Sequence, residues 1–177
     1  LISTAIAFGV VGAAFIAPEE ARADTCLLDT DGDGNADSNR DTDGGADDNG
    51  GINSNLACGV DAQATGNAGA IALGFQTRAP EIGGTAIGAA AQATGIEATA
   101  IGIDARATFN ESTAIGAGAS ATAAFSVALG ADSVADQSAT VSVGSTASQR
   151  RIVNVANGTD DTDAATVGQL NTAVGAA

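Results

Sequence analysis

The fold is decided by TAIGAAAQATGIEA (85–98), TAIGIDARATFNES (99–112) and TAIGAGASATAAFS (113–126), which are three copies of one fourteen-residue unit. The same period extends in both directions from this stretch. It is marked by six glycines at intervals of fourteen residues: Gly74, Gly88, Gly102, Gly116, Gly130 and Gly144. A short, fixed period predicts a repeat architecture in which each unit stacks on its neighbours.

Each unit predicts two short strands. An aliphatic residue stands one position before the glycine in every copy, and small residues stand two before it and mostly three and five after it. Alternation with period two favours strands, and glycine is expected where the chain turns or where backbones approach closely. The sequence therefore predicts an all-β parallel β-roll over residues 56–148, about 29 Å tall over its six glycine-marked coils. Gly59 precedes Gly74 by fifteen residues, and we place the extra residue in the turn 66–69.

The first strand of a unit has no polar face. Thr113 and Ile115 point to one side, while Ala114 and Gly116 point to the other. A strand that is apolar on both faces is usually buried on both. Because a two-strand coil has only one interior, we infer an oligomer that covers the second face. The alternative is a monomeric roll with a small, alanine-rich exposed face.

Composition and charge exclude several classes of function. The 177 residues include no Met, Trp, Tyr or His, and the formal charge is −15. This charge argues against a nucleic-acid partner. Without His or Lys most nucleophile–base pairs cannot be built, so we predict a protein that is not an enzyme. The missing initiator Met leads us to expect a fragment.

The N-terminal residues 1–23 read as a truncated signal peptide. Residues 1–17 are apolar, and Ala21-Arg22-Ala23 matches a signal-peptidase site with cleavage before Asp24. Export of the chain would follow. The alternative is a membrane anchor, for which seventeen residues is a marginal length.

Residues 24–55 form a separate segment rich in Asp and Gly. Alternating aspartates with glycines between them suit a tight calcium loop, because Ca²⁺ prefers several hard oxygen ligands. The segment resembles loops of the EF-hand, dockerin and thrombospondin type 3 kinds, although Arg40 stands where an EF-hand has Glu. The alternative is a disordered acidic linker. The predicted calcium ligands are Asp29, Asp31, Asp33, Asp37 and Asp41, with Asp43 and Asp47 in a second, weaker site.

Cys26 and Cys58, the only cysteines, bracket this segment. In an exported protein such a pair suggests a disulfide. By the loop-entropy model it would stabilise the fold by about 3 kcal/mol. The alternative for Cys58 is a small buried core residue.

After Gly144 the period ends. Residues 149–166 do not continue the fourteen-residue repeat. Val167, Leu170 and Val174 then follow at the spacing of a coiled-coil seam, which predicts a helix over 167–177. Asp160, Asp161 and Thr162 are predicted to lie at the start of the helix, where they would favour capping and the helix dipole.

The segment RRIVNVANGTDDTDAATVGQLN (150–171) resembles the neck motif of the trimeric autotransporter adhesins, the YadA-like family, and TAIGAGASATA (113–123) and SVALGADSVA (126–135) resemble its head repeats. The resemblance implies a trimeric left-handed parallel β-roll head, a neck leading to a coiled-coil stalk, and a C-terminal outer-membrane anchor. Arg150, Arg151, Asn154 and Asp163 become candidate neck residues. We expect at least one of the two arginines to pair with Asp160, Asp161 or Asp163, within or across chains.

The predicted function is that of a homotrimeric adhesin head on the surface of a Gram-negative bacterium. Its partner would be host extracellular matrix or another surface ligand, which no motif in the sequence names. One alternative is a trimeric phage tail-fibre-like protein. Another is an ice-binding solenoid with threonine rows at positions 85, 99 and 113 and at 94, 108 and 122.

Overall fold

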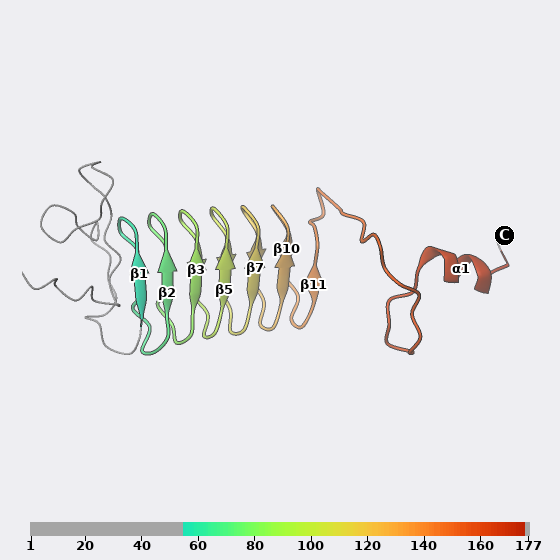
Figure 1. The fold of residues 1–177 in the computed structure, drawn as a ribbon, viewed down its shortest axis with the longest axis horizontal. Helices are drawn as coiled ribbons and strands as arrows, with labels where there is room; N and C mark the ends of the chain where they lie inside the picture. Colours follow the sequence, from blue (N-terminus) through green and yellow to red (C-terminus); the bar gives the residue numbers. More distant parts are fainter. Residues whose placement is uncertain (1–54, 176–177) are drawn as a thin grey trace, which may run out of the picture.

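The computed structural model describes residues 55–175, which form a stack of coils followed by an extended segment and a short helix (Figure 1). The elements are β1 (Leu56–Cys58), β2 (Ile71–Leu73), β3 (Thr85–Ile87), β4 (Gln92–Ala93), β5 (Thr99–Ile101), β6 (Arg106–Ala107), β7 (Thr113–Ile115), β8 (Ser120–Ala121), β9 (Val127–Leu129), β10 (Val134–Ala135), β11 (Val141–Ser142) and α1 (Val167–Ala173).

The strands form two parallel sheets, one on each side of the roll. The first has the order β1-β2-β3-β5-β7-β9-β11, and the second has the order β10-β8-β6-β4. Every pairing joins equivalent positions of adjacent coils, so Thr85 pairs with Thr99 and Thr99 with Thr113. The predicted parallel β-roll with two strands per coil is therefore confirmed.

The core of the roll is built almost entirely of alanine. The alanine in the middle of each first-sheet strand points inward and is fully buried, as at Ala86, Ala100 and Ala114. Other small residues complete the interior from the second sheet and the turns. The threonine and aliphatic residues beside each central alanine therefore face outward. A lone roll would expose this aliphatic face, so the alternative of a monomeric roll with an alanine-rich exposed face is wrong about which face lies outside.

Four of the marker glycines, Gly74, Gly88, Gly102 and Gly116, lie where the backbones of adjacent coils come close together. Gly102 has a φ of +132°, and a Cβ added to it would lie 2.5 Å from the carbonyl oxygen of Gly116 in the next coil. No side chain fits at that separation, and the backbone angle itself disfavours one. The period of the sequence is thus the period of this contact.

Each coil also turns through two left-handed residues, which the sequence did not reveal. Their φ angles lie between +54° and +66°. Most of them are not glycine, and their side chains range from Ala to Phe and Glu. The first turn column is Asp61, Gln76, Ala90, Asp104, Gly118 and Asp132, and the second is Gly69, Gly83, Glu97, Glu111, Phe125 and Ala139.

The first coil contains the one extra residue of the roll. Leu56 pairs with Ile71 at an offset of fifteen, whereas Ile71 pairs with Thr85 at fourteen. The bridge between Gln63 and Arg78 also has an offset of fifteen residues. The left-handed glycines Gly69 and Gly83, by contrast, are fourteen residues apart. The insertion therefore lies between residues 64 and 69, in agreement with the predicted turn 66–69.

Candidate functional site

The outer face of the first sheet is an aliphatic surface. The residues that precede the marker glycines point outward along it, and Ile115 and Leu129 are 37% and 45% exposed in the single chain. The row Thr85, Thr99 and Thr113 runs in register beside them. This face is flat and apolar, and its chemistry fits packing against another protein surface rather than binding a small polar ligand.

The outer face of the second sheet is polar. One in-register column across it consists of Gln63, Arg78, Gln92, Arg106 and Ser120, and the column ends at the exposed Val134. Both arginines are exposed, and within residues 55–175 neither side chain makes a hydrogen bond or an ion pair. The second threonine row, at 94, 108 and 122, directly follows the strands of this sheet. The two faces of the roll thus differ sharply in character.

A buried asparagine lies just before β1, in the first coil that the structure describes. Asn55 is 3% exposed, and its Nδ2 donates to the carbonyl oxygens of Ala64 and Gly66 at 2.9 and 2.6 Å. Its Oδ1 accepts from the backbone N–H of Ala70 at 2.9 Å. The amide therefore satisfies three backbone groups of the turn between β1 and β2. Sequence reasoning missed this role, although a polar residue in a column of small residues was a usable signal.

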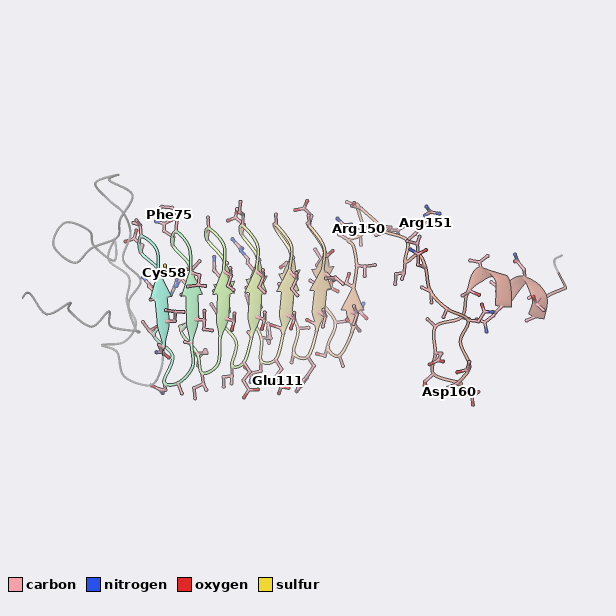
Figure 2. The ribbon with its side chains drawn as sticks, in the orientation of Figure 1. Cys58, Phe75, Glu111, Arg150, Arg151 and Asp160 are labelled. Atoms are coloured by element: carbon pink, nitrogen blue, oxygen red, sulfur yellow. The ribbon has the colours of Figure 1, made fainter. Side chains whose placement is uncertain are left out.

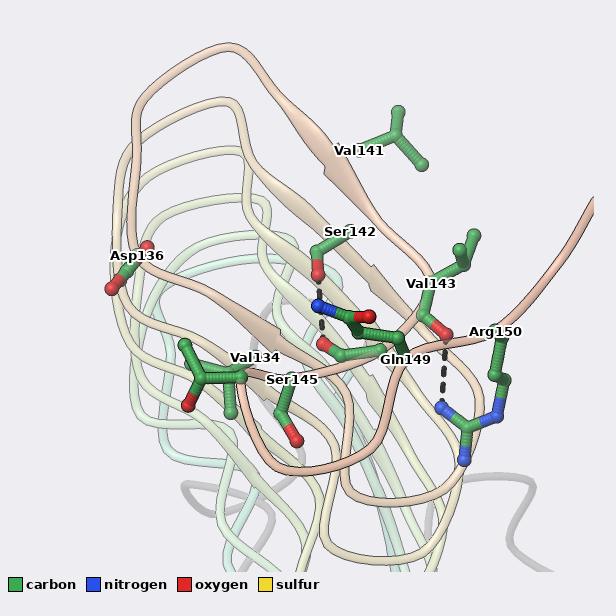
Figure 3. A pocket seen from close by; sticks show the side chains of 10 residues that line it. Val134, Asp136, Val141, Ser142, Val143, Ser145, Gln149 and Arg150 are labelled. Carbon is green, nitrogen blue, oxygen red and sulfur yellow. Dashed lines mark hydrogen bonds between the residues drawn. The ribbon is translucent and has the colours of Figure 1, made fainter.

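Arg150 closes the C-terminal end. Its guanidinium donates from Nη1 to Ser133 Oγ at 3.0 Å and to the Val143 carbonyl at 2.9 Å, and from Nη2 to the Ala131 carbonyl. Figure 3 shows it beside an open pocket of about 480 Å³ at the last coil. The lining residues are Val134, Asp136, Val141, Ser142, Val143, Gly144, Ser145, Thr146, Gln149 and Arg150.

The predicted ion pairs of the neck are not present within the described chain. Arg150 is engaged with the roll, and the exposed Arg151 makes no hydrogen bond with residues 55–175. Pairing across chains stays a prediction. Asn154, the third candidate neck residue, has a φ of +61°, so it redirects the backbone.

Asp163, the fourth candidate, organises a loop instead. Its Oδ2 accepts from the backbone N–H groups of Thr159 and Asp160 at 2.9 and 3.2 Å. The backbone hydrogen bond from Thr159, followed by that from Asp160, lowers the pKa of Asp163 below its ordinary value, because both stabilise the carboxylate.

The helix begins later than the acidic residues suggested. Thr166 is the N-cap of α1 and forms a capping box with Gln169, whose side chain also donates to the Gly158 carbonyl at 2.9 Å. The expectation that residues 160–162 start the helix is wrong, because Asp163 holds them in a turn. Val167 and Leu170 are 74% and 57% exposed, so α1 presents its apolar seam uncovered in the single chain.

Other predicted features lie wholly or partly outside the described residues. These are the signal peptide 1–23 and all seven candidate calcium ligands from Asp29 to Asp47. Cys58 is disulfide-bonded, but Cys26 also lies outside, so their pairing stays a prediction. Between residues 55 and 175 there is no group of three or more His, Cys, Asp or Glu that could hold a metal. No helix in that range is long and apolar enough to cross a bilayer.

Two family models match the chain. The coiled stalk of trimeric autotransporter adhesin matches residues 151–177, and the YadA head domain repeat matches residues 79–105, 93–119 and 110–133. The crystal structure of the collagen-binding domain of the Yersinia adhesin YadA is similar, with a TM-score of 0.61 and 30% identity over 70% of this chain and 76% of that one. No curated protein matches. The alanine-cored roll, the neck and these matches together show that the chain belongs to the trimeric autotransporter adhesins of the YadA-like kind.

Proposed function

We propose that this chain is the head of a cell-surface adhesin that attaches to extracellular matrix and performs no catalysis. The observation that carries this proposal is the contrast between the two faces of the roll. The aliphatic face of the first sheet is suited to burial in the trimer. The polar face of the second sheet, with Arg78 and Arg106, then points outward on all three protomers and is available to a ligand.

The shape of the outward face favours a large ligand over a small substrate. The polar column of the second sheet is a long, flat row of donors and acceptors. Such a row suits an extended protein that contacts several coils at once. Collagen binding by the similar YadA domain makes a matrix protein the first partner to test. We place the head outside the outer membrane of a Gram-negative bacterium, held there through the C-terminal anchor of the family.

Binding of the purified trimer to immobilised fibrillar collagen, laminin and fibronectin tests the proposal. We expect saturable binding to at least one of them, and weaker binding by the double variant Arg78→Ala/Arg106→Ala. Arg151→Ala/Arg106→Ala is the matched control, because it removes the same charge but keeps one arginine of the polar face. Failure of the intact trimer to bind any of the three proteins would overturn matrix attachment. Binding by Arg78→Ala/Arg106→Ala as tight as that of the unmodified trimer would move the site away from the polar face.

A further inference from the structure

Apolar side chains gather on both turn edges of the roll, on either side of the first sheet. We define the first turn edge as Val60, Phe75 and Ile103, which are 41%, 52% and 59% exposed. The second turn edge consists of Ile82, Ile96, Phe109 and Phe125, which are 44%, 41%, 52% and 56% exposed. Figure 2 shows the separation of the two edges, with Phe75 on one and Glu111 on the other.

These edges continue the aliphatic face of the first sheet. Single exposed apolar residues are ordinary on a protein surface. Here, however, the second turn edge has one on each of four successive coils, and all three phenylalanines of residues 55–175 are more than half exposed. Edge, face and opposite edge therefore carry apolar side chains on three sides of the roll, with exposed carboxylates such as Asp104 and Glu111 beside them on the edges. Apolar side chains gathered over successive coils, rather than scattered singly, mark an interface.

The symmetry of the family trimer determines what each edge meets. Three faces can converge about an axis parallel to them, and we take this axis to be the stacking direction of the coils, along which the neck and α1 continue from the roll (Figure 1). Contacts around a three-fold axis are heterologous, so one edge of a protomer meets the opposite edge of the next. A rotation leaves height along the axis unchanged. Each coil therefore faces the same coil of its neighbour.

From this geometry we propose that the trimer is sealed at its three corners by an edge-to-edge contact between a first turn edge and the neighbour's second turn edge. Coil by coil, Ile103 meets Phe109 of the neighbouring copy. One coil further on, Ala117 on the first edge leaves room for Phe125 on the second. Ala89 and Ile96 repeat this small-to-large match one coil before Ile103. The contact concerns assembly alone, so it stands or falls independently of the ligand of the head.

Tryptophan fluorescence tests the proposal without disturbing the fold. The chain has no Trp or Tyr, so Phe125→Trp introduces a single reporter on the second turn edge. We expect its emission in the trimer to lie at shorter wavelength than in the unfolded chain, and to be protected from acrylamide. Thr122→Trp, an exposed site after β8 in the same coil, is the control and should be quenched freely. Equal quenching of the two reporters in an intact trimer would overturn the proposal.

A charge pair tests which coils meet. Ile103→Glu and Phe109→Lys should each lower the trimer fraction in sedimentation, and the double variant should recover most of the loss. These residues lie on opposite edges of one coil, so recovery must come from contact between chains. The mismatched pair Ile103→Glu with Phe125→Lys, whose residues lie one coil apart, should recover less of the trimer fraction. A matched pair that is no better than either single variant would contradict the proposed register.

Discussion

The close approach of the marker glycines predicts a severe and local sensitivity to one methyl group. In Gly102→Ala, the new Cβ would lie 2.5 Å from the Gly116 oxygen and 2.6 Å from its carbonyl carbon. The backbone angle of +132° costs an alanine about 1–3 kcal/mol, and forcing a methyl group into a packed contact costs about 1–3 kcal/mol more. We therefore expect the free energy of unfolding to fall by about 2–6 kcal/mol per chain, measured by urea denaturation at fixed protein concentration.

Gly118→Ala is the matched control for this prediction. Gly118 also has a positive φ, +66°, but the atom that its Cβ would approach most closely belongs to the Asp132 side chain, which can move. Ala90 already occupies the equivalent position two coils earlier, with a φ of +57°. We expect a loss of no more than about 1–2 kcal/mol. If the two variants lose the same stability within about 0.5 kcal/mol, contact between coils does not limit the residue at Gly102.

Three further predictions concern other parts of the chain. Ala114→Asp buries a charge in the roll and should unfold it. Ile115→Asp, at the next residue on the outer face, should dissociate the trimer but leave the circular dichroism of the roll unchanged. Equal effects of the two variants would contradict the assignment of faces. The lowered pKa of Asp163 means that its carboxylate stabilises the folded loop fully above the ordinary value of 3.8 and ceases to do so as the pH falls through the depressed value. Protection of the loop amides against hydrogen exchange, relative to the intrinsic rate at each pH, should therefore fall only in that acidic range, and in Asp163→Asn it should be low at every pH. Finally, we propose that the segment 24–55 binds calcium. Titration calorimetry of the oxidised protein should show heat of binding at millimolar calcium, and a chelator should increase proteolysis of the segment. No heat of binding and unchanged proteolysis would favour the acidic-linker alternative.

The roll could be predicted from the sequence because the contact between coils that requires glycine recurs once in every repeat. Gly102 and Gly116 recur at the spacing of the contact that requires them. The alternation of Ala114 and Ile115 showed that both faces of the strand are apolar. It did not show which face is inside. The structure decides this in favour of alanine, because two sheets in so thin a coil leave room only for small side chains.

The features that escaped prediction depend on contacts between coils rather than on residue type. Phe125 and Glu111 share one left-handed turn position, although neither residue favours that conformation, because the coils above and below fix the backbone there. The acidic run before α1 matched a helix start, yet Asp163 uses the free N–H groups of its own loop, and Thr166 takes the cap. Arg150 was expected to pair with a carboxylate, but it donates instead to backbone carbonyls at the C-terminal end of the roll.

Because the coils stack in register, the length of the head can change by whole repeats. Loss of residues 99–112 would join Ala98 to Thr113, and β3 could then pair with β7 through the Thr-Ala-Ile register that already joins neighbouring coils. Each unit gained or lost changes the height by about 4.8 Å. A repeat can be gained or lost by recombination within a coding sequence, so the height of such a head can change without a new interface between coils having to evolve.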